Sequence, residues 1–194
     1  MDKSILTLGG PSWINLVNTI YISNKQEIDI LANASSVLQW MKENNLVRES
    51  DVLALEKKKL LDSLIVELQS TRTLCNTILS EIEQNRKLSL RTTNKIKSAV
   101  EKLQGSLTIN SESEKLKITF QGKTIEDHIM YGIMDSIINT FENTSLERIR
   151  KCNHEECRLY FVDTSKAGKR RWCSMELCGN RKKAAEFYSK KKKK

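Results

Sequence analysis

Four of the five cysteines in this chain form two pairs with the same internal spacing. Four residues separate Cys152 from Cys157, four separate Cys173 from Cys178, and fifteen lie between the pairs. Zinc prefers four soft thiolates in a tetrahedron, and two cysteine pairs on two tight turns can supply them. The spacing therefore predicts one structural Zn²⁺ per chain, bound by these four cysteines.

The residues around the cysteines favour a metal site over a cluster of buried free thiols. Arg150, Lys151, Arg170 and Arg171 flank the two pairs, and their positive charge favours the thiolate form. His154 lies between the first two cysteines and is a competing ligand. Four thiolates already close a tetrahedral site, so an exposed turn is the favoured interpretation of this histidine.

The sequence between and after the cysteines predicts a hairpin followed by a helix. Residues 158–162 are rich in strand-forming side chains, and a helix is expected to start near Met175 with Cys178 in its first turn. This order of turn, hairpin and helix is treble-clef-like. Because so small a segment cannot bury a core by itself, we expect metal ligation to supply its folding free energy.

The chain as a whole has the composition of a helical protein with a packed core. Hydrophobic residues make up 39% of it, and Pro11 is the single proline, which favours helices over disorder. No stretch approaches the roughly 18 unbroken apolar residues of a membrane span. Residues 1–23 lack the order of segments that marks a signal peptide, so we expect a cytoplasmic protein that does not contact membranes.

Hydrophobic periodicity predicts several helices in residues 1–145. The first covers residues 35–45 with Ser35 or Ser36 as its cap, and the second covers 51–84. The third begins at Thr92 or Thr93 and is stopped by Gly105, and the fourth covers 124–142. The apolar stripe of the second helix comprises Leu61, Ile65, Leu68, Arg72, Cys75, Leu79 and Ile82, and that of the third comprises Ile96, Val100 and Leu103.

Alternation with period two predicts a β-hairpin from residues 107–109 and 116–120. Residues 13–20 fit a short buried helix or a strand, and residues 21–34 are expected to be a loop. The expected fold is therefore mainly α with one small β-hairpin in an N-terminal domain, residues 1–145. A treble-clef-like zinc module of a β-hairpin plus a helix follows over residues 146–190, and then a disordered lysine tail over residues 190–194.

The positive charge of the chain is concentrated at one end. Residues 148–194 contain 16 Lys and Arg and 5 Asp and Glu, a net charge of +11, whereas residues 1–147 contain 17 and 19, a net charge of −2. A basic end on a near-neutral body is typical of a protein that binds a polyanion.

Basic side chains on both sides of the second cysteine pair are the candidate contacts to nucleic acid. A rigid zinc module can present guanidinium groups to phosphates or to guanine edges. Aromatic residues of the same segment, Tyr160, Trp172 and Tyr188, could add stacking. For Trp172, as for Phe161, the favoured interpretation is the small core of the module. The candidate basic residues are Arg170, Arg171, Arg181, Lys182 and Lys183.

One charged residue, Arg72, interrupts the apolar stripe of the long predicted helix. Such a residue usually pairs with a carboxylate or extends to the surface. The alternative is an anion-binding group in a pocket for a small-molecule effector, with Asn15 or Asn18 also lining that pocket.

The C-terminal residues resemble a known family. Arg170-Arg171-Trp172-Cys173-Ser174-Met175, followed by Cys178-Gly179-Asn180-Arg181, is similar to the CGNR zinc finger over about residues 146–190, and Phe161-Val162-Asp163 also fits its pattern. Upstream, Leu16-Val17-Asn18-Thr19 and Leu38-Gln39-Trp40 resemble the ABATE domain that usually precedes this finger, although Asn15 stands where that family commonly has aspartate. The resemblance implies a bacterial, stress-linked transcription regulator with a DNA-binding C-terminus.

The leading hypothesis is a regulator whose zinc finger contacts double-stranded DNA while the N-terminal domain senses a small-molecule effector or forms a homodimer. The alternatives are an RNA- or ribosome-associated zinc protein and a zinc-thiolate redox sensor. We expect no enzymatic activity, because a closed four-thiolate site leaves no position for a catalytic water.

Overall fold

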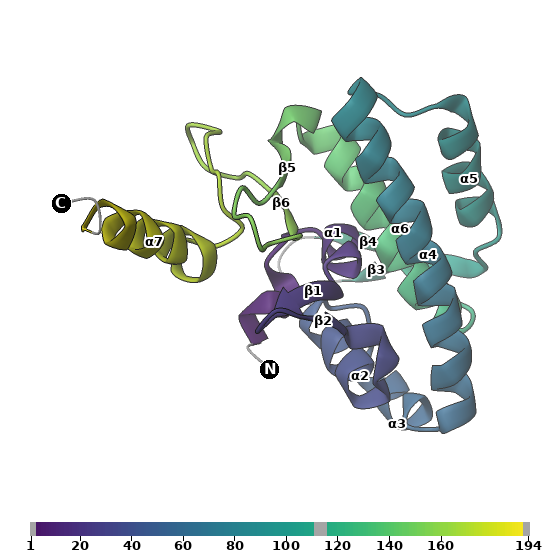
Figure 1. The fold of residues 1–194 in the computed structure, drawn as a ribbon. Coiled ribbons are helices and arrows are strands. Elements are labelled where there is room, and N and C mark those ends of the chain that lie inside the picture. Colours follow the sequence, from purple (N-terminus) through teal and green to yellow (C-terminus); the bar gives the residue numbers. More distant parts are fainter. Residues whose placement is uncertain (1–2, 111–115, 192–194) are drawn as a thin grey trace.

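The computed structural model describes residues 3–110 and 116–191 and consists of a helical body with a small unit of hairpin and helix at one side (Figure 1). We call residues 146–191 the zinc module and the described residues before them the body. The helices are α1 (Ser12–Val17), α2 (Ala34–Glu43), α3 (Val52–Leu55), α4 (Lys58–Asn85), α5 (Leu90–Glu101), α6 (Ile125–Asn143) and α7 (Asn180–Lys191). The strands are β1 (Ile20–Ser23), β2 (Gln26–Asp29), β3 (Gly105–Asn110), β4 (Lys117–Gly122), β5 (Ile149–Lys151) and β6 (Tyr160–Val162). Short 3₁₀ turns cover Lys3–Thr7, Ile30–Ala32, Glu49–Asp51 and Leu146–Arg148, and a π-helical turn covers Met175–Gly179.

The core of the body lies where α1 crosses α4 and α6. Residues 12–17 form a helix rather than a strand, and Trp13 is fully buried with its indole N–H donating to the Thr140 hydroxyl at 2.9 Å. The stripe predicted for α4 is buried except for the half-buried Ile65. The predicted mainly helical fold is confirmed. None of the described helices is both long and apolar enough to cross a bilayer.

The helix predicted as continuous over residues 51–84 is broken near its start into α3 and α4. Glu56 ends α3, and Lys57 has an extended backbone before α4 begins. A continuous helix would place Lys57 or Lys58 on the apolar stripe, three or four residues before Leu61. The break instead leaves both lysines exposed and turns Leu55 fully into the core.

Helix ends differ from the prediction where another side chain makes the cap. Asn33, not Ser35 or Ser36, accepts the hydrogen bond that starts α2, and Ser89 rather than a threonine starts α5. The inward face of α5 uses Ala99 in place of Val100, which is exposed. The helix ends at Glu101, and the glycine expected to stop it, Gly105, begins β3 instead. The prediction for α6 is confirmed, and its N-terminus carries a full capping box between Thr124 and Asp127.

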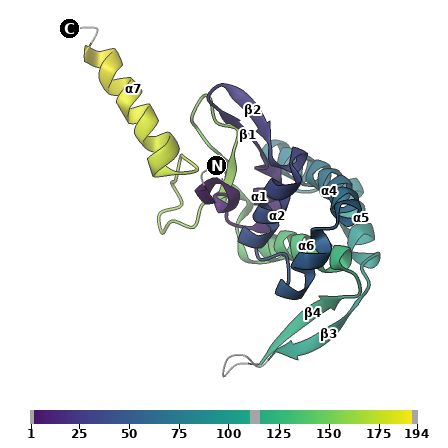
Figure 2. The same ribbon diagram turned by 90° about the horizontal axis from the view of Figure 1, so that it is seen from below.

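The body contains two hairpins, of which the sequence analysis predicted one. Strands β3 and β4 pair antiparallel in the expected place and project beyond the helices (Figure 2). The segment expected to be a loop holds the second hairpin, in which β1 pairs with β2 through a two-residue turn. Both turn residues, Asn24 and Lys25, have a left-handed backbone, as a type I′ turn requires.

Arg72 anchors the β1–β2 hairpin to α4. Its guanidinium donates to both carboxylate oxygens of Asp29 at 2.7 and 2.8 Å and to the Thr19 hydroxyl at 2.8 Å. Burial raises the pKa of the Asp29 carboxyl, but the hydrogen bonds from Arg72 and the Leu31 N–H outweigh it and hold that pKa below its ordinary value. Arg72 therefore pairs with a carboxylate, the first of the two predicted roles.

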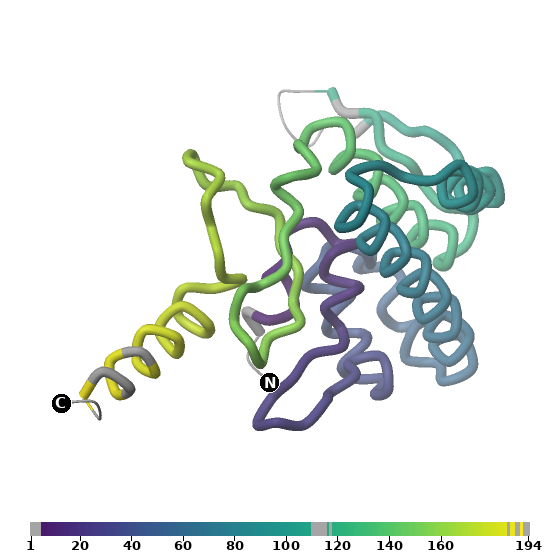
Figure 3. Tube along the Cα trace, turned by 45° about the horizontal axis from the view of Figure 1, so that its top comes forward, coloured from purple at the N-terminus to yellow at the C-terminus, as the bar shows by residue number. Residues whose placement is uncertain are grey.

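The zinc module packs directly against the body (Figure 3). Asn18 takes the place of a neighbouring strand for β6: its amide donates to the Tyr160 carbonyl at 2.8 Å and accepts from the Tyr160 N–H at 2.9 Å. The Val162 N–H donates to the Gly9 carbonyl at 3.0 Å. Phe161 and Leu159 belong to the same core cluster as Trp13, so the hydrophobic core continues across residue 145.

We expect Asn18→Ala to lower the free energy of unfolding by about 2–3 kcal/mol, because it removes the Asn18 partner of the half-buried Tyr160 N–H and C=O. Urea titration followed by circular dichroism measures this change. Asn139→Ala, which removes an exposed amide bonded to Asp135 and Asn143 in α6, is the matched control and should change stability by less than about 0.5 kcal/mol. Equal losses in the two variants would contradict the role of Asn18.

Candidate metal centre

The structure brings together the sulfurs of Cys152, Cys157, Cys173 and Cys178, all within 4.8 Å of one another. Cys173 Sγ lies 3.7 Å from Cys157 Sγ and 3.6 Å from Cys178 Sγ. A tetrahedral zinc with Zn–S bonds of about 2.3 Å separates its ligand sulfurs by about 3.8 Å, whereas a disulfide needs about 2 Å. The four cysteines are therefore spaced as zinc ligands, and together with the zinc-finger sequence they are consistent with one structural Zn²⁺.

The first cysteine pair lies on the turn that connects β5 and β6. The Cys152 N–H donates to the Leu159 carbonyl at 2.9 Å and extends the β5–β6 ladder by one pair beyond Lys151. The Cys157 N–H donates to the His154 carbonyl at 2.9 Å, which closes the turn between the two ligands. His154 is not among the clustered ligand groups, and its Nδ1 accepts from the Glu156 N–H at 3.2 Å.

The second cysteine pair flanks the start of the π-helical turn Met175–Gly179: Cys173 directly precedes its capping residue, Cys178 lies within it, and the turn leads directly into α7. Ser174 caps this turn by accepting from the Leu177 N–H at 3.2 Å, and its carbonyl accepts from the Cys178 N–H at 3.1 Å. The two pairs are joined by backbone contacts, with the Cys173 N–H donating to Cys152 Sγ at 3.4 Å and the Asn153 N–H to the Arg171 carbonyl at 2.9 Å. The start of α7 is thus fixed to the metal centre.

The close packing of the sulfurs makes their ionisation interdependent. A hydrogen bond from Cys157 lowers the pKa of Cys152, whereas the hydrogen bond to Cys152 raises the pKa of Cys173. Four sulfurs at this distance can all become thiolates only when a cation balances their charge. Arg181 adds positive charge from the first turn of α7, with one guanidinium nitrogen 3.9 Å from Cys178 Sγ.

The ligand set is closed and water is largely excluded from it. Cys152, Cys173 and Cys178 are buried, and Cys157 is partly buried. Four thiolate ligands fill a tetrahedral zinc site, which suits a structural metal whose binding contributes folding free energy. The hairpin and helix around it, as predicted, are the β5–β6 pair and α7.

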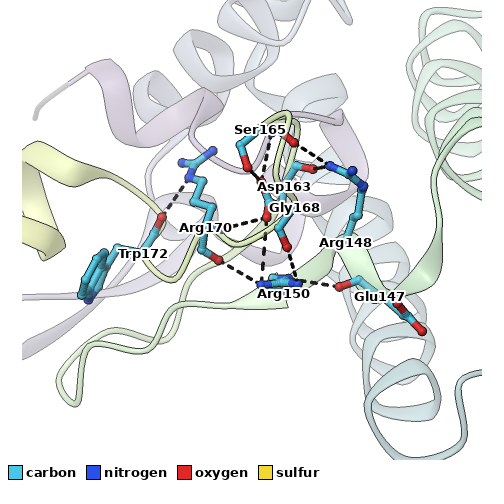
Figure 4. Close-up of polar contacts among 8 residues, drawn as sticks. All are labelled: Glu147, Arg148, Arg150, Asp163, Ser165, Gly168, Arg170 and Trp172. Atoms are coloured by element: carbon cyan, nitrogen blue, oxygen red, sulfur yellow. Dashed lines mark hydrogen bonds and ion pairs between the residues drawn. The ribbon is translucent and has the colours of Figure 1, made fainter.

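A second group of polar residues, which the sequence analysis did not assign, holds the loop between β6 and Cys173 (Figure 4). Asp163 is fully buried and accepts from the Ser165 N–H and hydroxyl at 3.0 and 2.6 Å and from the Arg170 N–H at 2.8 Å. Burial opposes ionisation of this carboxyl, but the hydrogen bonds from Ser165 and Arg170 outweigh it and hold the pKa below its ordinary value. The Arg150 guanidinium lies 4.0 Å away and adds a favourable charge.

Two arginines at the start of the module bind the backbone of the same loop. Arg148 donates to the carbonyls of Asp163 and Ser165 at 2.9 and 2.8 Å. Arg150 donates to the carbonyls of Gly168 and Arg170 at 2.8 and 3.3 Å. Gly168 has a φ of +59° with the Arg148 guanidinium close to where a β-carbon would stand, so the turn requires glycine there. Residues 163–170 therefore form a rigid loop, which we call the arginine-held loop.

The five basic residues predicted to contact nucleic acid occupy different environments. Arg170 is half-buried, stacks on Phe161 at 4.5 Å and donates to the carbonyls of Trp172 and Cys173, so it supports the module from within. Lys182 pairs with Glu155 at 2.6 Å and ties α7 to the first cysteine turn. The side chains that are exposed are Arg171, Arg181 and Lys183.

The predicted aromatic core of the module is present in part. Phe161 is fully buried, and Trp172 is half-buried with the Arg171 guanidinium 4.9 Å from its ring. Tyr188 is exposed on α7. Lys191 still belongs to α7, so the helix includes the first residues of the predicted lysine tail, and residues 192–194 lie outside the described part of the chain.

The residues predicted to line an effector pocket are each bonded to protein groups. Asn15 accepts from the Gly9 N–H at 2.8 Å and donates to the Asn44 side chain at 2.7 Å. Asn18 binds β6 and Arg72 binds Asp29, as described above. All three side chains therefore make hydrogen bonds within the protein, and an effector pocket around them stays a prediction.

Comparison with known families agrees with the geometry. Residues 148–191 match the family model of the CGNR zinc finger. The match begins with Arg148 of the arginine-held loop network, contains the four cysteines and ends with α7. No curated protein matches the chain in sequence. The zinc module thus matches the CGNR zinc finger in sequence, and its four cysteines are placed to bind one zinc.

We expect the purified chain to contain one zinc per molecule and Cys173→Ser to lose most of it, since the site needs four thiolates. Atomic emission spectroscopy measures the metal. Cys75→Ala is the matched control, because Cys75 is buried in α4, where burial raises its pKa to about 12, and lies outside the cluster. Removing the metal with a chelator should reduce the helical signal of α7 while the body remains folded. Full zinc content in Cys173→Ser would contradict the site.

We expect Asp163→Asn to loosen the arginine-held loop. The NH2 group of the new amide would face the Arg170 N–H, and two donors cannot form a hydrogen bond. Trypsin should then cleave after Lys166 or Lys169, both exposed in this loop, several times faster than in the unaltered chain. Mass spectrometry of timed digests locates the cuts. Asp135→Asn on the exposed face of α6 is the control, and unchanged cleavage in Asp163→Asn would show that the loop does not depend on this carboxylate.

Proposed function

We propose that this chain is a DNA-binding regulator in which the zinc module contacts double-stranded DNA through α7 and the arginine-held loop. The observation that carries the proposal is the position of α7. This basic helix projects from the metal centre away from the body (Figure 1) and packs chiefly on the π-helical turn that precedes it.

The dimensions and charge of α7 suit the major groove. Its 12 residues span about 18 Å, and the groove of B-DNA is about 12 Å wide and admits one α-helix. Lys183 is exposed, as is Arg181, whose Nε also donates to the Leu177 carbonyl at 2.7 Å. A helix whose first turn is fixed to a metal centre presents these charges with little loss of conformational entropy.

The arginine-held loop offers a second basic contact at the same end of the molecule. Lys166 and Lys169 are exposed on it, and Arg171 follows directly. Because Arg148 and Arg150 bind the loop backbone, these exposed charges stand on a fixed frame. Contacts of this kind to phosphates set the register of a protein on DNA, while base edges in the groove provide sequence selection.

For the body we propose a regulatory role of the type implied by its resemblance to the ABATE domain. A groove of about 780 Å³ between α4, α5 and α6, with Leu74, Leu103 and Met130 among its apolar lining, is of a size that small-molecule sites commonly have. We propose this groove, rather than the predicted pocket around Arg72, as the site for an effector. Direct packing of β6 on the body supplies the physical connection between such a site and the zinc module.

The double variant Arg171→Gln/Lys183→Gln should weaken binding to duplex DNA and reduce the slope of log affinity against log salt by about 1.8, since each lost phosphate contact removes about 0.9. Fluorescence anisotropy with labelled duplexes over a series of salt concentrations measures both. Lys58→Gln/Lys59→Gln is the matched control, because it removes the same charge from exposed positions at the start of α4.

A selection of bound sequences from a random duplex pool tests the regulator itself. Enrichment of one motif supports it, and binding that never exceeds the non-specific background contradicts it. Structured RNA competing better than duplex DNA at the same salt concentration would instead assign the module to RNA.

A further inference from the structure

The β3–β4 hairpin carries an uncovered apolar face. Its register pairs Leu107 with Phe120 and Ile109 with Ile118, so these four side chains lie on one face of the ribbon. Leu107, Ile109 and Ile118 are exposed by 69%, 68% and 68%, and Leu116, just before β4, by 77%. The opposite face is polar, with Thr108 hydrogen-bonded to Thr119 across the strands at 3.1 Å.

The base of the hairpin is firmly attached although its apolar face is open. Phe120 stacks on Tyr131 of α6 with ring centroids 4.3 Å apart. The Lys123 N–H donates to the Gln104 carbonyl at 2.7 Å, and the Gln104 N–H donates to Asp127 at 3.0 Å. The ribbon beyond this base projects past the helices (Figure 2), and a two-stranded hairpin with one face in water is only marginally stable by itself. A covering partner would remove this apolar face from water.

We propose that a second copy of this chain covers the hairpin, so that two β3–β4 ribbons pack face to face about a two-fold axis. The exposed Leu107, Ile109, Leu116 and Ile118 of two copies present on the order of 1,000 Å² in all, which reaches the lower limit of about 1,000 Å² for a specific interface. The face consists of apolar side chains, so it complements another apolar face and needs no charged partner.

The charge distribution also favours this arrangement of two copies. Residues 1–147 carry a net charge of only −2, so two bodies can approach at their hairpins with little repulsion. The +11 charge belongs to residues 148–194, most of which form the zinc module, and this module stands at the other side of the body from the hairpin (Figure 2). A two-fold axis at the hairpin therefore keeps the two basic ends apart, and it uses the same surface of both copies. The proposal does not depend on DNA binding.

Sedimentation equilibrium of the full zinc-loaded chain, without nucleic acid, tests the proposal. We expect a dimer that dissociates in the micromolar range, and we expect Ile109→Lys to raise its dissociation constant about tenfold or more. Val66→Lys is the matched control: Val66 is 66% exposed on α4, so the same change to lysine away from the hairpin should leave dimerisation unaltered. Ile109→Thr, which keeps strand propensity, is a second test in case Ile109→Lys disturbs folding. It should also raise the dissociation constant of the dimer.

A chain that stays monomeric at about 100 µM would overturn the proposal. So would a dimer that Ile109→Lys and Ile109→Thr leave intact, or one that Val66→Lys weakens as strongly. A third contrary result is a monomeric chain that binds phosphatidylcholine vesicles and loses this binding in Ile109→Lys, because the hairpin would then face lipid. Since no DNA is present, none of these outcomes bears on the role proposed for α7.

Discussion

The structure depends on strand β6, because its three residues contact both the body and the rest of the zinc module. Tyr160 pairs with the Asn18 side chain, Phe161 enters the core, and the Val162 N–H binds the Gly9 carbonyl. The same strand pairs with β5 and so positions the turn that carries Cys152 and Cys157. Zinc then joins this turn to the one before α7. The module is consequently held by two independent constraints, the metal on one side of β6 and the body on the other.

The parts predicted correctly from the sequence are those with a local signal. Four cysteines with equal spacing and a basic setting identified the metal ligands before their geometry was known. Apolar residues that repeat every four positions from Ile125 to Phe141 identified α6. The alternation around residues 107–120 identified the β3–β4 hairpin. In each case the residues that carry the signal lie within one continuous segment of the chain.

The parts that were missed depend on partners far apart in the sequence or on weak turn signals. The β1–β2 hairpin turns at Asn24-Lys25, where the more usual second residue for such a turn is glycine. Asn18 meets Tyr160 across 142 positions, which no local pattern reveals. Arg150 was predicted to favour the thiolates and Arg170 to contact nucleic acid, yet the guanidinium groups of both, and that of Arg148, donate to backbone carbonyls inside the module. A sequence gives the number of positive charges but not which of them are already bonded.

These internally bonded arginines have a kinetic consequence. A guanidinium that donates to carbonyl oxygens keeps its full charge, so Arg148, Arg150 and Arg170 contribute to the electric field of the module without touching anything outside it. Their positions are fixed by the fold rather than averaged over many rotamers. In the proposed complex with DNA, these fixed charges would increase the rate of encounter, while the exposed side chains would determine how long the complex lasts. Attraction at a distance and residence at contact would then depend on different residues of one small module.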